Sequence, residues 1–256
     1  MKRIFFSLIL IIFILSSCLN DVKKKNNTVT VAAAANLRYV LENINKTFEK
    51  KTGIKIEMTT ASSGKLTAQI QNAAPYEIFI SANKKYPDYL YKNGFVLNEA
   101  KKICNGVLVL WTTKDIELNR NLKELCDLNI EALAIANPQN APFGKAAIET
   151  LKSLNIYKCF EQKIIYTENV SQISQYIVNK NADIGFTSKS IVLSKQLINK
   201  GKWIELPDTL YQTISEYAIL TKNAENNENA KKYYLFLFSK DAQNIFERGG
   251  YKIMKD

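Results

Sequence analysis

Four short segments combine small residues with hydrogen-bonding side chains, and each stands just before a stretch with helical periodicity. They are residues 34–37, 61–65, 141–145 and 168–171. The first N–H groups of a helix have no partner within the helix and carry partial positive charge. Small neighbours let a ligand reach these groups, and Ser or Asn adds a hydroxyl or amide donor. Together the segments predict an anion site, although each one alone could be an ordinary helix cap.

Strands and helices alternate along the chain, and this alternation must position the four segments. Apolar or alternating runs predict strands, and 3.6-residue periodicity predicts helices. The pattern favours an α/β fold with mostly parallel sheets covered by helices on both faces. Strands are predicted at 28–35, 54–59, 77–81, 107–111, 132–136, 163–166, 184–187 and 217–220, and helices at 37–48, 65–70, 87–92, 145–154, 170–178, 229–238 and 241–248. Lys51-Thr52-Gly53 is expected to stop the first helix, with Gly53 at the C-terminal cap position.

The pattern restarts near residue 132, and one strand returns late in the chain, which predicts two lobes joined by two crossings. We expect lobe I to comprise residues 28–105 plus 217–256, and lobe II residues 106–216. If the lobes face each other, all four helix starts can point into one cleft between them.

Composition excludes several classes of function. The 256 residues carry a net charge of +11 and include no His, so His-based catalysis and imidazole metal sites are absent. Positive charge permits nucleic acid, an acidic surface or an anion as partner. No dense basic block with interleaved aromatic residues occurs, so no nucleic-acid partner is expected. Without a Gly-x-Gly-x-x-Gly or Walker-type loop, nucleotide binding has no support, and no cofactor is predicted.

The N-terminus is typical of an exported protein. Met1-Lys2-Arg3 precedes the apolar run 4–15, which is too short to span a bilayer comfortably, and Ser16-Ser17-Cys18 follows. Residues 1–18 resemble a lipoprotein signal peptide in which Cys18 becomes the acylated first residue, with 19–27 as a flexible linker. We therefore expect a protein anchored to a membrane on its extracytoplasmic face. An ordinary signal peptide or an uncleaved anchor helix is the alternative.

Three further cysteines, Cys104, Cys126 and Cys159, lack Cys-x-x-Cys spacing and permit at most one disulfide. Cys104 and Cys126 are the closer pair in sequence. Each cysteine could equally be a small buried hydrophobic residue.

The order and spacing of seven motifs resemble those of the periplasmic molybdate-binding proteins of ABC importers. The motifs cover residues 28 to 253 and stand at 30–37, 61–70, 73–82, 137–147, 168–172, 182–186 and 242–251. The resemblance implies a two-lobed type II periplasmic-binding fold with a ligand cleft between the lobes. It also implies a monomer that captures molybdate or tungstate through hydrogen bonds, with no direct metal ligands, and delivers it to a permease and its ATPase.

The resemblance also assigns ligand-binding roles by position. It implies a hydroxyl and backbone N–H from Ser63 and backbone N–H groups from Phe143 and Val170. Asn36 stands where many members have Ser, and its amide can still donate. Ser188 stands where some members have Tyr, and its shorter side chain leaves contact with the anion open.

Four alternatives remain open on the sequence. Sulfate and phosphate are smaller oxyanions, and a phosphate site would favour a carboxylate acceptor, for which only Glu168 is near. Ferric iron would need tyrosine pairs, and Tyr233-Tyr234 lies in an amphipathic helix where packing explains it better. A hydrolase with a Ser nucleophile is remote, because the general base would have to be Lys or a carboxylate. Lys65 is interpreted as a solvent-facing residue that attracts anions at long range.

Overall fold

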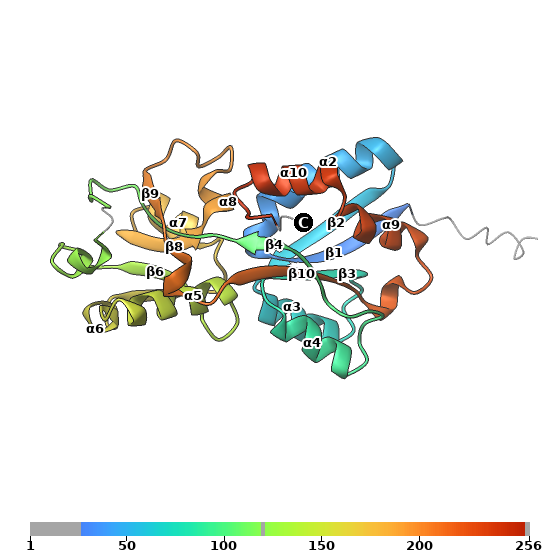
Figure 1. Cartoon of the computed structure of the whole chain (residues 1–256), viewed down its shortest axis with the longest axis horizontal. Helices are drawn as coiled ribbons and strands as arrows, with labels where there is room; N and C mark the ends of the chain where they lie inside the picture. Colours follow the sequence, from blue (N-terminus) through green and yellow to red (C-terminus); the bar gives the residue numbers. More distant parts are fainter. Residues whose placement is uncertain (1–26, 119–120, 254–256) are drawn as a thin grey trace, which may run out of the picture.

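The computed structural model describes residues 27–118 and 121–253. The predicted signal peptide, the acylated Cys18 and the linker up to residue 26 lie outside the described residues. Among the described residues, no helix has the length and apolar character needed to cross a membrane. The chain forms two lobes side by side, each built around its own sheet (Figure 1).

The first sheet has the strand order β2-β1-β3-β10-β4. Strand β1 runs parallel to β2 and β3, whereas β10 is antiparallel to both of its neighbours. Along β1, Val31 packs into one apolar cluster and Ala32 into another, because successive side chains point to opposite faces. Burial on both faces explains why the second half of the strand, from Val31 to Ala34, is apolar without interruption. The bounds are β1 Thr28–Ala34, β2 Lys55–Ala61, β3 Ile78–Ser81, β4 Lys101–Gly106 and β10 Ile214–Leu220.

Helices cover both faces of this first sheet (Figure 1). One face carries α2 (Arg38–Thr52), α9 (Glu228–Phe236) and α10 (Lys240–Arg248), and the other carries α3 (Ser63–Gln71) and α4 (Lys85–Lys92). Helix α2 ends at Gly53, whose φ of 70° lies in the left-handed region that glycine adopts without penalty. The predicted end of this helix is confirmed.

The second sheet repeats the arrangement of the first, with the order β7-β6-β8-β5-β9. Strand β6 is parallel to β7 and β8, and β5 is antiparallel to β8 and β9. The predicted two-lobed α/β fold is confirmed, and strands β4 and β9 are additions that the sequence pattern did not indicate. The bounds are β5 Leu108–Thr112, β6 Leu133–Ala136, β7 Ile164–Thr167, β8 Ile184–Ser188, β9 Lys202–Glu205, α5 Pro142–Ser153, α6 Tyr157–Phe160, α7 Ile173–Val178 and α8 Lys189–Val192.

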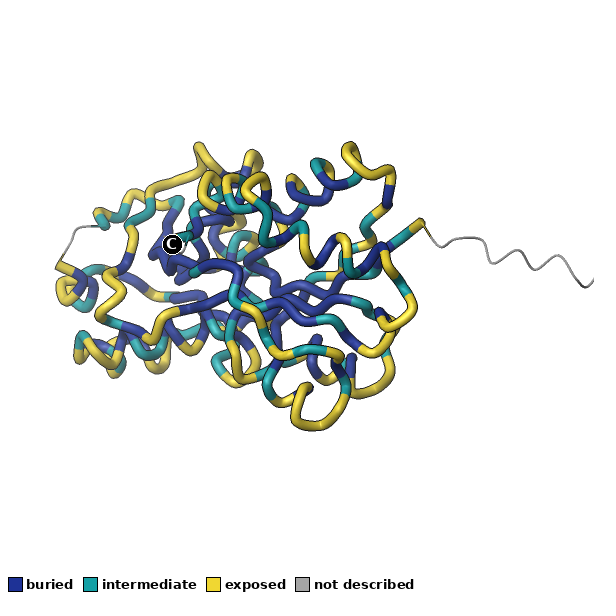
Figure 2. The backbone as a smooth tube through the Cα atoms, turned by 45° about the vertical axis from the view of Figure 1, so that its right-hand side comes forward, coloured by how far each residue is buried: buried dark blue, intermediate teal, exposed yellow. Residues whose placement is uncertain are grey.

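The chain passes between the sheets twice, once from β4 to β5 and once from β9 to β10. One cluster of buried apolar residues runs through both lobes. In Figure 2 the strands form the buried interior, while the outer helices and loops alternate between buried and exposed positions. The lobes therefore share a core at their junction.

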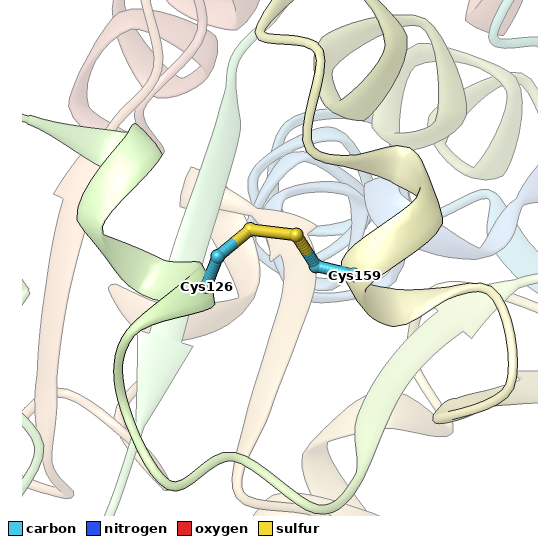
Figure 3. The surroundings of a disulfide bond; sticks show 2 residues. All are labelled: Cys126 and Cys159. Atoms are coloured by element: carbon cyan, nitrogen blue, oxygen red, sulfur yellow. A yellow bond between two sulfur atoms is a disulfide. The ribbon is translucent and has the colours of Figure 1, made fainter.

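A disulfide joins Cys126 to Cys159 within the second lobe, with a Cα–Cα distance of 5.8 Å (Figure 3). Cys126 ends the short 3-10 helix Leu122–Cys126, and Cys159 lies on α6. Cys104 is buried and free on β4, and burial raises the pKa of its thiol well above the usual value. The pair closest in sequence therefore does not form a bond, because Cys104 belongs to the first sheet and Cys126 to the second lobe.

Removing this disulfide should destabilise the protein. The cysteines are 33 residues apart, and closing such a loop stabilises the folded state by about 3–4 kcal/mol, or roughly 10 °C in Tm for a protein of this size. Thermal unfolding with and without a reductant should show this shift in the wild-type chain and none in the Cys126→Ser/Cys159→Ser variant. Equal sensitivity of both proteins to the reductant would contradict the assignment.

Candidate functional site

The four segments predicted from the sequence meet in one pocket between the lobes. Every segment contributes to the lining, and Ala82 beyond the end of β3 completes it. The lining residues are Ala34, Ala35, Asn36, Ser62, Ser63, Ala82, Ala141, Pro142, Phe143, Asn169 and Val170. None of these lining residues, all within the described ranges, has a charged side chain. The pocket therefore offers backbone N–H, hydroxyl and amide groups.

Ser62 occupies the N-terminal cap position of α3, but its side chain makes no capping hydrogen bond. The residue is 4% exposed, and its Oγ is buried without a hydrogen-bond partner. Leaving a hydroxyl in this state costs roughly 1–3 kcal/mol. A ligand in the pocket would supply the missing partner. The sequence motif points to Ser63 and misses Ser62, although a Ser directly before a helix was a usable signal.

Ser63 is the first residue of α3 and is fully buried. Its Oγ accepts a hydrogen bond of 3.1 Å from the backbone N–H of Ala82, so the hydroxyl ties α3 to the end of β3. The backbone N–H of Ser63 lies in the first turn, where the helix supplies no acceptor. Ser63 thus lines the pocket as predicted, with its hydroxyl already engaged as an acceptor.

Helix α5 brings the N–H of Phe143 to the pocket. The helix begins with Pro142, whose missing N–H would have had no partner in any case. A Cβ on Gly144 would lie 1.9 Å from the carbonyl oxygen of Ala136, so only glycine permits this approach of α5 to the end of β6. Phe143 is buried beside this contact, with its N–H in the first, unpaired turn.

Val170 lies in a turn rather than at the start of a helix. We expected the helix to begin at residue 170, but α7 begins at Ile173. The side chain of Asn169 holds the turn, since its Oδ1 accepts a hydrogen bond of 3.0 Å from Ser171 N–H. Val170 is 4% exposed and lines the pocket, so it reaches the pocket from a turn and not from the start of a helix.

Asn36 follows β1 in a single 3-10 turn, Ala35–Leu37, and is 1% exposed. Its Nδ2 donates to Glu216 Oε1 at 2.7 Å and to Tyr251 Oη at 3.1 Å. Both amide hydrogens therefore point to buried groups behind the lining. Asn36 reaches the pocket as predicted, but in this orientation its amide does not donate into it.

Ser188 is not brought to the pocket lining. It ends β8, and its Oγ lies 2.8 Å from the Oγ of Ser190. Ser190 Oγ in turn donates to the backbone carbonyl of Asn36 at 2.7 Å. Ser188 therefore belongs to a hydrogen-bonded chain behind Asn36.

Contacts between the lobes surround the pocket and close it. Gly64 N–H donates to Asn140 O at 3.0 Å, and Tyr86 Oη donates to Gln139 O at 3.2 Å. Lys65 Nζ pairs with Glu168 Oε1 at 2.7 Å, and both side chains are about half exposed. Lys65 is thus half exposed, which fits the predicted solvent-facing side chain, but it also holds an ion pair across the cleft.

The enclosed space is small. It measures ≈ 10 Å³, which admits about one water-sized group between the closed lobes. A sugar, amino acid or peptide would need a far larger cavity. A closed space this small favours a compact ligand, and the neutral donors around it favour an anion.

Ser62 and Lys65 are the residues of this region that could act as a nucleophile and its base. Ser62 and Lys65 have Ser-x-x-Lys spacing, and a Ser nucleophile requires a base within hydrogen-bonding reach. Lys65 Nζ instead lies on Glu168 at the exposed rim, and Ser62 Oγ has no partner. The two side chains do not form a nucleophile and base pair in this structure.

The tyrosine pair weighed as an iron site lies elsewhere. Tyr233 donates to Asn45 Oδ1 and packs edge-on against Phe48 of α2, while Tyr234 Oη accepts from Asn98 Nδ2 at 3.0 Å. Their predicted packing role fits these contacts. Across residues 27–118 and 121–253, no group of three or more His, Cys, Asp or Glu side chains could hold a metal ion.

Comparisons with known proteins agree with this architecture. A family model for bacterial extracellular solute-binding proteins matches residues 29–252. The molybdate-binding protein ModA of Rhodobacter capsulatus is 31% identical over 224 residues, which cover 87% of each chain. ModA of Escherichia coli is 27% identical over 233 residues, 88% of this chain and 89% of that protein. The solved periplasmic molybdate-binding protein of Azotobacter vinelandii is 29% identical, with a TM-score of 0.84 over 89% of this chain and 100% of that one.

The contact at Gly64 generates a prediction about lobe closure. A Cβ there would lie 2.9 Å from Tyr86 Oη and 3.1 Å from Asn140 Cα, so Gly64→Ala should shift the lobes toward an open state. Small-angle X-ray scattering should show a larger radius of gyration. Because Ala is the better helix former, α3 itself should not be weakened. Gln71→Ala, at the far end of α3, is the matched control, and an unchanged radius for Gly64→Ala would contradict the role of this contact.

Proposed function

The chain belongs to the family of bacterial extracellular solute-binding proteins, and we propose that it captures molybdate or tungstate for an ABC transporter. The observation that carries this proposal is the closed interlobe pocket lined by neutral donors, with the hydroxyl of Ser62 buried and unpaired. Buried donors aimed at one point favour a charged acceptor, since hydrogen bonds to charged groups are the strong ones. A bare oxyanion supplies acceptors on all sides and needs no counter-cation.

The donor set consists of the Ser62 hydroxyl and the backbone N–H groups of Ser63, Phe143 and Val170. Asn36 joins this set when its amide turns from Glu216 and Tyr251 toward the pocket. These groups come from both lobes, so binding of the anion favours the closed state. Two relatives that are named for molybdate binding support the choice of ligand. Sulfate and phosphate are not favoured, and ferric iron lacks a ligand cluster in the described residues.

The proposal extends to the setting of the protein. Cys18 follows the small residues Ser16 and Ser17, and we infer that it carries the lipid that anchors the protein on the extracytoplasmic face of a membrane. A permease and its ATPase would then receive the anion from the opened cleft. We assign the pocket to binding rather than catalysis, because Ser62 has no base beside it.

A panel of anions tests the ligand. Molybdate, tungstate, sulfate, phosphate and ferric citrate should be added to protein that starts after Asn27, with thermal unfolding as the readout. A ligand at 100 times its dissociation constant that binds only the folded state adds about 2.7 kcal/mol of stability. We expect this response to molybdate and tungstate. A strong response to sulfate or phosphate with none to molybdate would overturn the assignment.

Substitution of the two serines tests how the anion is held. Ser62→Ala should weaken molybdate binding by about 1.5–3 kcal/mol, ten- to a hundredfold, through loss of a charge-assisted hydrogen bond. It removes no capping bond, so the stability of the free protein should hold. Ser63→Ala should weaken binding and also lower that stability, because Ala82 N–H loses its acceptor.

Lys65→Ala is the matched control, since an exposed ion pair contributes about 0–1 kcal/mol. Calorimetric titration gives all three affinities. Loss of binding in Lys65→Ala with no change in Ser62→Ala would show that direct ion pairing recognises the anion.

A further inference from the structure

A buried carboxyl group stands directly behind the proposed oxyanion pocket. Glu216 lies on β10, the strand by which the chain returns to the first lobe, and is fully buried. Its Oε1 accepts the 2.7 Å hydrogen bond from Asn36, whereas its Oε2 is buried without any partner. The strand pairing shifts register between Glu216 and Tyr217, and such bulges re-aim side chains. Among the described ion pairs none includes Glu216.

Two titratable groups face this carboxyl, and both stay protonated at neutral pH. Cys104 on β4 lies opposite Glu216 in the strand pairing. Tyr251, in the C-terminal segment, accepts a hydrogen bond from the same Asn36 amide that donates to Glu216. Burial and Glu216 raise the pKa of Cys104 by more than the positive charge of Lys102 on β4 lowers it. The Phe143 ring of α5 and Glu216 Oε1 both lie beside Gly106. Strand β3, which also neighbours β10, contains only Ile, Phe and Ser and so adds no charged group.

Burial is the main cause of the shifted pKa values in this group. Burial raises the pKa of Glu216 to about 8. Burial and the nearby Glu216 raise the pKa values of Cys104 and Tyr251 well above their usual values. Between about pH 6.5 and 9.5, Glu216 is therefore the member of this group that changes charge.

The hydrogen bonds of Asn36 show why the protonation state of Glu216 matters to an anion. Both amide hydrogens of Asn36 are committed to Glu216 and Tyr251. The Asn36 side chain therefore has only its Oδ1 left for the pocket, and that oxygen would repel an anion. Turning the amide over would present its N–H groups to the pocket and its Oδ1 to Glu216. A carboxylate cannot donate to Oδ1, but a carboxylic acid can.

Charge leads to the same requirement. A carboxylate behind Asn36 would face a bound dianion across a single side chain, in a buried region where screening by salt is weak. Two like charges so placed disfavour each other, and the proton on the carboxyl group removes the repulsion.

We propose that Glu216 is a positioning residue whose protonated form turns the Asn36 amide toward the pocket, so that the oxyanion binds only while Glu216 carries its proton. This inference rests on the proposed function. Below the pKa of Glu216 the acid is already protonated and binding takes up no proton. Above it, each binding event must draw a proton from solvent, so the apparent Kd should rise about tenfold per pH unit.

The test is calorimetric titration of the wild-type chain with sodium molybdate, which stays a dianion from about pH 6.5 to 9.5. The Kd should be nearly constant up to about pH 7.5 and should rise more than tenfold by about pH 9.5. At about pH 9, runs in two buffers with different ionisation enthalpies should show uptake of close to one proton per anion.

Glu216→Gln carries an amide that can donate to Asn36 Oδ1 at every pH. It should bind molybdate at about pH 6.5 within roughly threefold of the wild-type affinity, with no pH dependence and no proton uptake. Glu205→Gln, a change at a carboxylate on β9 whose side chain is 36% exposed, is the matched control and should keep the wild-type pH profile.

The outcomes separate this inference from the proposed function. A wild-type Kd that stays flat to about pH 9.5, or an unchanged pH profile in folded Glu216→Gln, would overturn the role of Glu216 alone. So would a folded Glu216→Gln that fails to bind at about pH 6.5, because the carboxylate itself would then be required. If Glu216→Gln does not fold, proton uptake by the wild-type chain at about pH 9 still tests the role of Glu216: close to one proton per anion supports it, and none overturns it. No binding by the wild-type chain at any pH would overturn the proposed function itself.

Discussion

Unpaired hydrogen-bond donors at the ends of strands are the constraint on which this structure depends. In each lobe the parallel strands end at the edge that faces the other lobe, and the helix or turn that follows leaves its first N–H groups without partners. Small residues stand at these points so that backbones can approach closely, as Gly144 does against Ala136. The motifs therefore combine small residues with hydrogen-bond donors because the unpaired N–H groups lie where backbones must approach closely.

The two lobes are joined by a buried polar network as well as by two crossings of the chain. The backbone carbonyl of Asn36 accepts hydrogen bonds from Ser190 in one lobe and from Tyr251 in the other. Such networks are costly when incomplete, and most of this one is satisfied. Glu216 Oε2 is a member of this network that lacks a partner, and it lies behind the pocket. Ser62 Oγ, outside the network, also lacks a partner and belongs to a residue that lines the pocket.

Charge and recognition are separated in this molecule. The net charge of +11 attracts anions over long distances and is sensitive to salt. The pocket itself is lined by neutral groups, and Lys65, a cation on the same helix as Ser63, is paired with Glu168. The surface can therefore influence how fast an anion arrives, while the buried donors determine how tightly it is held.

The sequence by itself determined the alternation of strands and helices, the end of α2 at Gly53 and the four segments that meet at the pocket, because periodicity and turn residues are local. The tertiary structure decided what depends on spatial neighbours. It paired Cys126 with Cys159, added the edge strands β4 and β9, and delayed the start of α7 through the side chain of Asn169. It also distinguished Ser62 from Ser63, since adjacent residues at a helix start point in different directions and only the packed neighbours show which hydroxyl is already bonded.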